Sequence, residues 1–506
     1  MRVALIHLTE GVDGTPVSPV VDHLGLEMLA GALGAEGCAV MIIDTALMRM
    51  SEEDALVRTA SFGPDLVGFS LNYANARASV NMAMRIEALL PQARLIAGGY
   101  YATFHDEELL GEGQPFEAIV RGEAEDSIRH IARHGQPIRW DDIPGVSFCC
   151  RGNIARNPCA PPPGLDFLAP ANRECLRFLA QWPMGCRKVA IEASRGCNSS
   201  CTFCSIAACQ RLGGDHVGRR VREPKIVAKE IRSIVREFGL REFWFMDANF
   251  LGDRSEVAGS LKLADAIGEL SLPLELEFDT RADSVSKEVV QAFRAVGLKR
   301  VFLGVESFYE PLLRTMKKGT TAALNMKAIH TLLESDVRPI LGIIMFHPDS
   351  TVEQIRQDHG VLSSIGYQYT QMLFRLKYYR GTRVANASDC QGRGAKLGDD
   401  YGWDFRDPVV DLLWRMFDTV RTRVLDLVFR DAARMYLCGR LSLDDFNAFT
   451  DKAFSAVGAA LGWGLAEIGR ATTSRADAIK LAAEFGDSIA LSLNLPGAEI
   501  GQQKTL

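Results

Sequence analysis

The chain has 506 residues, of which 47% are hydrophobic and 24% are charged. This composition excludes general disorder, because enough apolar side chain is present to offset chain entropy, and the length suggests about three domains. A formal net charge of −6 argues against a generic polyanion binder, so no nucleic-acid partner is expected. The first residues lack the pattern of a signal peptide, and no apolar run approaches the ~20 residues of a spanning helix. We therefore expect a cytoplasmic protein with no membrane partner.

Strands and helices are predicted to alternate over residues 1–148. The strands are apolar throughout, which is typical of a parallel sheet covered by helices on both faces, so we expect a doubly wound, flavodoxin-like domain. The predicted strands are 3–6, 40–44, 65–70, 94–97 and 118–120. Residues 149–185 contain Pro158, Pro161, Pro162 and Pro163, which break helices, and are predicted to form a linker.

A second alternation of strands and helices runs over residues 186–385. It predicts a partial (β/α)6 barrel of the triose-phosphate-isomerase type, in which chemistry takes place at the C-terminal ends of the strands. The predicted strands are 188–193, 242–246, 274–279, 300–305, 339–346 and 371–376, and the predicted helices are 225–238, 255–270, 286–296, 322–333 and 352–365. Residues 386–506 carry helical spacing and predict an α-helical C-terminal region. The tryptophans of that region, Trp403, Trp414 and Trp463, are expected to pack in its core.

Four of the twelve cysteines follow the first predicted barrel strand in one short loop. Cys197, Cys201 and Cys204 have the spacing C-x3-C-x2-C, and thiolates are suitable ligands for an iron–sulfur cluster. A 4Fe–4S cluster bound by three cysteines keeps one iron open for another ligand. The alternatives are a structural zinc site completed by Cys209 or His216 and an iron–sulfur electron-transfer module.

This loop, with Phe203 before its last cysteine, closely resembles that of the radical S-adenosylmethionine (radical SAM) superfamily. The resemblance implies that Cys197, Cys201 and Cys204 hold a 4Fe–4S cluster and that S-adenosylmethionine binds its open iron. One electron from the cluster would then cleave the sulfonium and release a 5′-deoxyadenosyl radical. Phe203 would lie beside the adenine, and Cys209 is outside the family pattern.

Further positions on the barrel strands resemble the family's cofactor contacts. Glu306, in the sequence Gly304-Val305-Glu306-Ser307, would bind the ribose, and Arg281 would meet the cofactor carboxylate or form a structural salt bridge. Asp247 and Asn249 end the second strand and His347 follows the fifth. These three are candidate catalytic residues, with Tyr378 and Tyr379 as further candidate acids, bases or electron relays, and each has a structural role as its alternative.

The N-terminal region resembles the cobalamin-binding domain of one branch of this superfamily. The resemblance rests on 24–30, on 64–70 and on the two glycine-containing segments 97–103 and 120–123. It implies that cobalamin contacts Asn72, Tyr73, Gly98, Gly99, Thr103, Gly122 and Glu123. Tyr100 and Tyr101 are bulky and are able to fill the tail pocket, and His23 is expected at the surface or at a helix start rather than on cobalt.

The resemblance implies an enzyme that uses a 4Fe–4S cluster, S-adenosylmethionine and cobalamin. The expected reaction is methylation of an unactivated carbon of a small-molecule biosynthetic intermediate, with an electron donor such as flavodoxin or ferredoxin as partner. The alternative is a cobalamin-independent radical dehydratase, epimerase or cyclase whose N-terminal domain has kept the fold and lost the cofactor.

Overall fold

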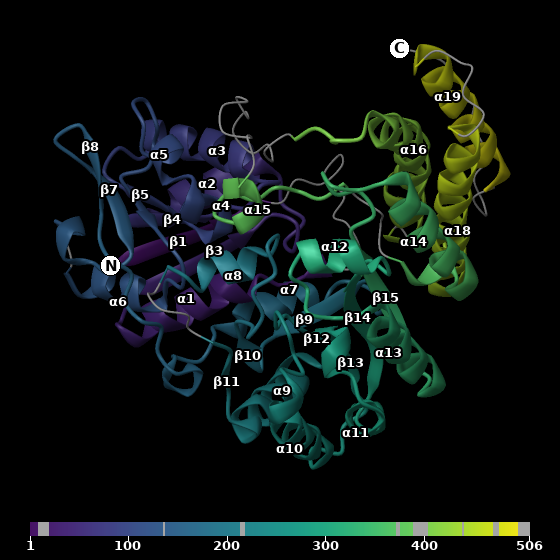
Figure 1. The fold of residues 1–506 in the computed structure, drawn as a ribbon. Helices are drawn as coiled ribbons and strands as arrows, with labels where there is room; N and C mark the ends of the chain where they lie inside the picture. The colour runs from purple at the N-terminus through teal and green to yellow at the C-terminus, as the bar shows by residue number, and fades with distance from the viewer. Residues whose placement is uncertain are drawn as a thin grey trace. The chain divides into compact units, whose positions relative to one another are not determined.

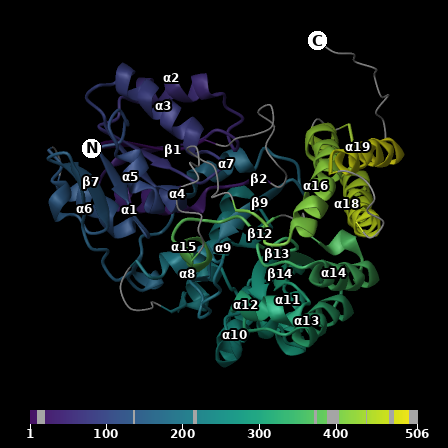
Figure 2. The same ribbon diagram turned by 45° about the horizontal axis from the view of Figure 1, so that its top comes forward.

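The computed structural model describes residues 1–8, 20–134, 137–212, 218–370, 375–387, 403–437, 440–468 and 475–493. The chain divides into two compact units. Unit 1 comprises Met1–Thr280, Glu288–Lys299 and Tyr378–Gly402, and unit 2 comprises Arg281–Lys287, Arg300–Lys377 and Trp403–Leu506. Figures 1 and 2 show the ribbon from two directions.

A seven-stranded sheet forms the N-terminal part of unit 1, in the order β3-β1-β4-β5-β6-β7-β8. Its first five strands are parallel. These are β1 (Arg2–His7), β3 (Ala39–Asp44), β4 (Leu66–Ser70), β5 (Arg94–Gly98) and β6 (Ala118–Val120). In chain order their arrangement is 2-1-3-4-5, the flavodoxin-like order, so the predicted doubly wound domain is confirmed.

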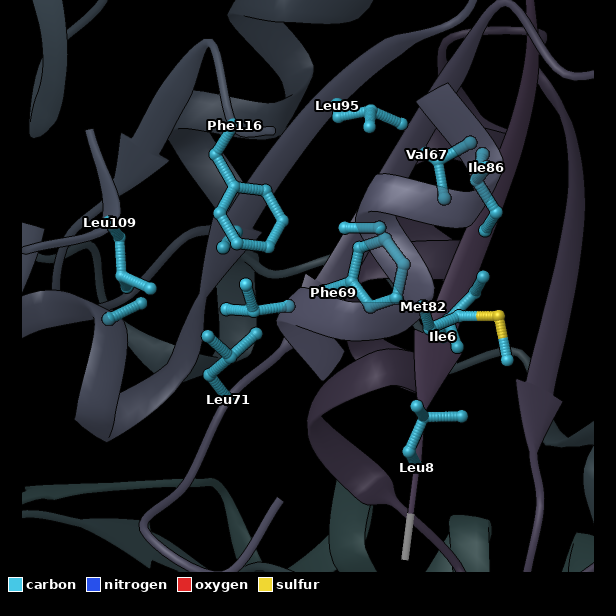
Figure 3. Close-up of a cluster of buried hydrophobic side chains, with 14 of the residues drawn as sticks. Ile6, Leu8, Val67, Phe69, Leu71, Met82, Ile86, Leu95, Leu109 and Phe116 are labelled. Atoms are coloured by element: carbon cyan, nitrogen blue, oxygen red, sulfur yellow. The ribbon is translucent and has the colours of Figure 1, made fainter. Parts of the chain in front are cut away.

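Helices cover both faces of this sheet. α2 (Glu52–Phe62) and α3 (Ala76–Leu89) lie on one face, and α1 (Leu24–Ala35) and α6 (Glu125–His134) lie on the other (Figures 1 and 2). Ile6, Phe69 and Met82 belong to the buried cluster on the α2/α3 face (Figure 3). A second buried cluster packs α1 and α6 onto the opposite face. Two buried faces explain why the strands are apolar without alternation.

The sheet extends beyond the predicted boundary at residue 148. β7 (Val146–Cys150) and β8 (Asn153–Arg156) form an antiparallel hairpin on the edge of the sheet, with Arg151 and Gly152 at positive φ in the turn. The predicted linker therefore begins inside a strand. Two short helices follow β5 and one follows the hairpin: α4 (Gly99–Phe104), α5 (Asp106–Leu109) and α7 (Leu176–Leu179).

Four parallel strands of unit 1 belong to the second sheet. They lie in the order β2-β9-β12-β13. Their bounds are β2 (Val20–Val21), β9 (Arg187–Ile191), β12 (Glu242–Phe245) and β13 (Glu275–Arg281), and the neighbouring helices are α9 (Pro224–Phe238), α10 (Val257–Gly268) and α11 (Lys287–Ala295). β10 (Ser194–Arg195) pairs with β11 (Arg220–Val221) just before the cysteine loop. Strand β2 was not predicted, since two residues carry no pattern.

Unit 2 contains most of β14 (Leu298–Glu306) and the parallel strand β15 (Arg338–Ile343). Its helices are α12 (Glu310–Thr315), α13 (Ala322–Glu334) and α14 (Val352–Ile365). The predicted strand 371–376 lies mostly outside the described residues. Thr370, just before this strand, and Arg375, within it, form parallel bridges with Leu341 and Phe346, respectively.

The C-terminal region is helical over its described residues, as predicted. α16 (Pro408–Asp426) packs against both α18 (Leu443–Glu467) and α19 (Arg475–Ser492). Trp403, Trp414 and Trp463 pack against the phenylalanine rings of Phe405, Phe346 and Phe485, respectively, which agrees with core packing. Among the described helices, none has the length and apolar character needed to cross a membrane.

Candidate functional site

The cysteine loop follows β9 and β10 and leads into α8 (Ser205–Cys209). Cys201 is buried, whereas Cys197 and Cys204 are half-buried, and none of the three is in a disulfide. Burial raises the pKa of Cys204, and the neighbouring Cys201 and Cys197 raise it further, while backbone N–H groups of α8 oppose the shift. Three thiolates brought together in one loop therefore need a positive partner, and an iron–sulfur cluster is such a partner.

Among the described residues, no group of three or more His, Cys, Asp or Glu side chains could hold a single metal ion. A 4Fe–4S cluster differs from a single ion because each cysteine binds a different iron, so the thiolates do not need to converge on one point. The donor set of the loop thus fits a cluster. Of the two residues considered for a zinc site, Cys209 ends α8 and His216 lies outside the described residues.

Two features fix the backbone that enters this loop. Gly196 has a φ of +87°, and a Cβ there would lie 2.5 Å from the side-chain nitrogen of Gln210. Asp247, which follows β12, accepts hydrogen bonds from the backbone N–H of Ala193 (3.0 Å) and from the hydroxyl of Ser194. Burial raises the pKa of Asp247 to about 7. Asp247 is thus a positioning residue for the loop.

Asn249, the second predicted catalytic residue on this segment, also makes structural contacts. Its side chain donates to the carbonyl of Gly252 (3.0 Å) and accepts from the hydroxyl of Thr280 (3.0 Å). Phe203 is half-buried in the cysteine loop itself.

Arg195 joins the cysteine loop to the seven-stranded sheet. Its guanidinium lies 2.9 Å from Glu123, 2.6 Å from Glu125 and 2.9 Å from Glu192. Glu123 also pairs with Arg220. The side chain of Arg195 is only 17% exposed, and the paired carboxylates hold its pKa above its usual range. We call Arg195, Glu123, Glu125 and Glu192 the arginine cluster.

A cavity of about 390 Å³ lies beside the cysteine loop; we call it the first cavity. Its lining includes Gly99, Tyr100 and Gly122 from the sheet domain and Cys209 from α8. The residues of the arginine cluster form another part of the wall, and residues 159–163 of the linker a third. This cavity is lined by many charged groups.

The second cavity, of about 370 Å³, lies at the C-terminal ends of the parallel strands on the α1/α6 face. Leu5, Ile96 and Val120 make it mostly apolar, and Ser70 also lines it. The arginine cluster lines this cavity as well as the first. In doubly wound sheets this edge is where ligands bind.

The predicted glycine segments lie at the two cavities. Gly98 lines the second cavity, while Gly99 and Gly122 line both. Gly99 has a φ of +89°, and a Cβ there would lie 2.7 Å from the carbonyl oxygen of Leu71, so the fold itself requires glycine. Thr103 connects the segments, because its hydroxyl donates to Gly99 O (2.9 Å) and accepts from Gly122 N–H (3.1 Å).

The two bulky residues Tyr100 and Tyr101 do not line the second cavity. Tyr101 is buried on the α2/α3 face and stacks on His105 at 3.9 Å. Tyr100 lines the first cavity, and its hydroxyl donates to the carbonyl of Arg380 (3.0 Å). Tyr73 packs against Tyr101 and also against Tyr379, with ring centroids 4.8 Å apart in the second pair.

Asn72 and His23 act locally. The side chain of Asn72 accepts from the backbone N–H groups of Ala74 (2.8 Å) and Asn75 (3.0 Å) in the turn before α3. His23 is the N-cap of α1, which confirms the predicted helix start. It is half-buried and lines the second cavity, rather than lying at the surface.

In unit 2, the structure joins two of the predicted cofactor contacts through one lysine. Arg281 forms a salt bridge with Asp283 (2.9 Å) and donates to the carbonyl of Lys318 (2.6 Å). Lys318 in turn lies 2.7 Å from Glu306. Glu306 has a φ of +65°, a strained conformation for glutamate that is found more often at functional sites than elsewhere. Lys318 was not predicted.

The other predicted residues of unit 2 have local partners. Ser307 is buried and donates to Asp358 of α14 (2.7 Å), and Gly304 lies within β14 opposite Gly342. His347 is 2% exposed, and its Nδ1 accepts from the N–H of Asp349 (3.1 Å). Burial lowers the pKa of His347 to about 4, and its Nε2 has no hydrogen-bond partner among the described residues.

Sequence reasoning missed the arginine cluster except for Glu123. The sequence contains an indication of this cluster. Arg195 directly precedes Gly196-Cys197, and a second acidic residue, Glu125, lies two positions after Glu123. Nothing in the spacing shows that these segments meet, since they are about 70 residues apart along the chain.

Comparison with protein-family models identifies two domains. Residues 191–360 match the radical SAM superfamily, and residues 12–132 match the B12 binding domain. The chain therefore contains a radical SAM domain preceded by a B12-binding domain, as the sequence predicted, and these domains support the predicted set of 4Fe–4S cluster, S-adenosylmethionine and cobalamin.

Curated relatives include two enzymes of known name. The chain is 29% identical over 323 residues to the hopanoid C-3 methylase of Methylococcus capsulatus, covering 61% of this chain and 58% of that protein. It is 26% identical over 381 residues to the anaerobic magnesium-protoporphyrin IX monomethyl ester cyclase of Cereibacter sphaeroides, covering 71% and 59%. The matched region thus spans less than two thirds of either relative's length.

Solved structures of similar fold include two cobalamin-dependent or cobalamin-bound enzymes. OxsB, described as a cobalamin-dependent S-adenosylmethionine radical enzyme, matches with a TM-score of 0.71 and 15% identity over 98% of this chain and 84% of that one. The radical SAM methyltransferase TsrM from Kitasatospora setae matches with a TM-score of 0.63 and 18% identity over 78% and 76%. These likenesses confirm the predicted fold class.

Proposed function

We propose that the protein is a cobalamin-dependent radical SAM enzyme that methylates an unactivated carbon of a small biosynthetic intermediate. The observation that supports this most strongly is the shared wall in unit 1. The arginine cluster borders both the first cavity, beside the cysteine loop, and the second cavity, at the edge of the sheet. A methyl donor and a radical source must act on one substrate, so their sites have to be neighbours.

Each proposed cofactor has residues of this chain to hold it. Cys197, Cys201 and Cys204 would bind the cluster, and the second cavity, with Gly98 at its edge, would take part of cobalamin. Arg281 and Glu306 would contact S-adenosylmethionine. When bound, the cluster and S-adenosylmethionine supply a carbon-centred radical and cobalamin supplies the methyl group.

The chain's own residues would position these groups and exclude water. Asp247 keeps the strand end in place before the first cysteine, through its bonds to Ala193 and Ser194. Arg195 neutralises carboxylates that would otherwise face one another at the border of the two cavities. The apolar wall of the second cavity keeps solvent away from a bound ring system. A small one-electron carrier such as flavodoxin or ferredoxin would supply the reductant.

Anaerobic reconstitution tests this proposal. The protein is loaded with iron and sulfide, with and without hydroxocobalamin, desalted, and incubated with S-adenosylmethionine and dithionite. We expect a retained corrinoid spectrum and release of 5′-deoxyadenosine. Absence of any retained corrinoid would contradict the methylation proposal, whereas absence of 5′-deoxyadenosine would contradict the radical SAM activity itself.

A radical cyclisation is the second candidate. The similarity to the magnesium-protoporphyrin cyclase, over 71% of this chain, is the observation that favours it. Product analysis separates the two reactions once a substrate is found. Methylation consumes a second S-adenosylmethionine and gives S-adenosylhomocysteine together with 5′-deoxyadenosine, whereas cyclisation gives no S-adenosylhomocysteine.

A further inference from the structure

A short segment of unit 1, residues 378–384, contacts the cysteine loop through its backbone; we call it the strap. It leads into the short helix α15 (Arg383–Ala387). The N–H of Val384 donates to the carbonyl of Thr202, inside the C-x3-C-x2-C motif, at 3.0 Å. The neighbouring residue of the strap, Arg383, is exposed. One peptide bond and one hydrogen bond therefore connect an exposed position to the loop that would bind the cluster.

Three arginines lie at the strap. Arg380 and Arg383 belong to it, and Arg211, seven residues after Cys204, donates to the carbonyl of Gly381 at 3.0 Å. Arg211 and Arg383 are exposed, and the side chain of Arg380 is 37% exposed. We call Arg211, Arg380 and Arg383 the strap arginines.

The strap arginines carry an excess of positive charge. Glu108 of α5 pairs with Arg380 at 3.2 Å. Arg211 and Arg383 form no ion pair with another residue that the structure describes. Because these four side chains include three guanidinium groups and one carboxylate, their field attracts an acidic partner.

The first half of the cysteine loop has a different charge environment. The side-chain amide of Asn198 donates to Asp253 (3.1 Å) and to Glu256 (3.3 Å). Arg219 pairs with Glu256, and Arg254 follows Asp253 in the chain. Two carboxylates are thus balanced by two guanidinium groups. Of these two groups of charged residues beside the loop, the strap arginines are the one that favours an acidic partner.

We propose that the strap arginines form the docking surface for a small acidic one-electron carrier, with flavodoxin as the type of partner. This inference rests on the proposed function, in which the cluster receives one electron before S-adenosylmethionine is cleaved. The reduced carrier loses one electron and the cluster gains it, with no bond made or broken between the two proteins. Electron transfer through protein slows steeply with distance, so the short connection from Arg383 to Thr202 favours this surface. Complexes of electron carriers are small and transient, and complementary charge mainly accelerates their formation.

Binding of flavodoxin to the reconstituted full chain tests the inference. Affinity is measured by calorimetry at low salt and at high salt, and we expect it to fall as salt rises, because salt screens exposed charges. R383E reverses a charge without removing a described hydrogen bond, whereas R211E also removes the bond to Gly381. At low salt each variant should bind flavodoxin about three- to tenfold more weakly, and R211E/R383E more than about tenfold more weakly.

The source of the electron separates docking from general damage. With photochemically reduced flavodoxin, release of 5′-deoxyadenosine by the variants should fall in parallel with affinity. With excess dithionite, a small reductant that needs no protein docking surface, the release should match wild type. The matched control R85E/R139E makes the same change of net charge at two other arginines, whose side chains are 42% and 65% exposed. It should bind flavodoxin as wild type does.

The outcomes distinguish this inference from the proposed function. The inference is wrong if R383E and R211E/R383E bind flavodoxin with wild-type affinity, if R85E/R139E weakens binding equally, or if wild type binds no flavodoxin. In each of these cases radical SAM activity with dithionite stands. If wild type releases no 5′-deoxyadenosine with dithionite, the proposed function itself fails. Should R211E lose its iron, R383E alone decides.

Discussion

The two cavities of unit 1 have nearly the same volume, but more charged residues line the first than the second. The first is bordered by charged side chains and the cysteine loop, while the second is bordered mainly by aliphatic side chains of the sheet and α1. The arginine cluster is common to both. Under the proposed function, the buried charges would position the groups around the cysteine loop. The apolar contacts would provide affinity for a large ring system. Each prediction below tests one side of this contrast.

The largest effect is expected from the cysteines. C197A, C201A or C204A removes one of three cluster ligands, and we expect iron content to fall to background and 5′-deoxyadenosine release to drop by more than about 100-fold. Corrinoid binding should remain, because the apolar cavity contains none of these residues. Iron analysis and chromatography of the reaction measure both effects.

Cys209 provides the matched control. It lies five residues after Cys204, is half-buried, and lines the first cavity. C209A should keep its iron and its spectrum. Loss of the cluster in C209A would instead make Cys209 a fourth ligand and remove the open coordination position on which the radical chemistry depends.

The next largest effect is expected from Arg195, which belongs to both cavities. R195Q leaves Glu123, Glu125 and Glu192 without their shared cation, and uncompensated charge in a site this enclosed costs about 3–5 kcal/mol. We expect a clear drop in melting temperature, together with weaker binding of both cluster and corrinoid. R195K should recover part of the loss, since it restores the charge without the forked geometry.

An exposed ion pair serves as the reference for Arg195. Arg85 pairs with Glu53, and the two side chains are 42% and 67% exposed. R85Q should change stability by less than about 1 kcal/mol. If R195Q behaves like R85Q, the arginine cluster is a surface feature and the proposed coupling of the two cavities is wrong.

The apolar cavity wall is tested by two valines of the same sheet. Val120 of β6 lines the second cavity, whereas Val67 of β4 packs on the opposite face of the sheet. Replacing either with phenylalanine overpacks a buried site at a cost of about 1–3 kcal/mol. V120F alone should weaken cobalamin binding, by more than about tenfold, while both variants keep their iron. Equal loss of cobalamin in V67F would assign the effect to general destabilisation.

The sequence predicted the elements whose pattern is local. The five parallel strands of the N-terminal sheet were recognised because burial on both faces leaves uninterrupted apolar runs. The cysteine loop was recognised from its spacing. The hairpin β7–β8 was missed because Cys149, Cys150 and Arg156 are exposed on an edge, so that no apolar run marks it.

Side-chain direction was beyond the reach of the sequence. Asp247 is a candidate catalytic residue by its place after the second barrel strand, and its hydrogen-bond partners are Ala193 and Ser194, more than 50 residues earlier in the chain. Ser307 bonds to Asp358, 51 residues later. The spacing of residues shows which side chains follow a strand, but it does not show which distant groups they bond to. The segments that form the site could therefore be predicted from the sequence, whereas the hydrogen bonds between them could not.

The smallest expected effect is a pH dependence of the melting temperature that is due to Asp247. It tests whether this residue has a structural or a catalytic role. Burial raises the pKa of this carboxyl to about 7, well above its value of 3.8 in the unfolded chain. Between these two values the folded protein binds more protons than the unfolded one, so the contribution of Asp247 to stability falls as the pH rises from about 4 to 7. Wild type should therefore melt at a lower temperature at pH 8 than at pH 5, with a contribution from this group of the order of 2 kcal/mol.

D247N keeps the acceptor for Ala193 and cannot ionise, so its melting temperature should vary less between pH 5 and 8. The same comparison applies to D279N. Asp279 of β13 is half-buried, desolvation raises its pKa to about 7, and it accepts from the indole of Trp244 at 3.0 Å. If D247N abolishes 5′-deoxyadenosine release while cluster content and melting behaviour match wild type, Asp247 acts on the reactants directly. The bonds to Ala193 and Ser194 favour the other result, in which activity falls only as far as cluster content falls, because a carboxylate already committed to two donors of its own loop has little capacity left for a substrate.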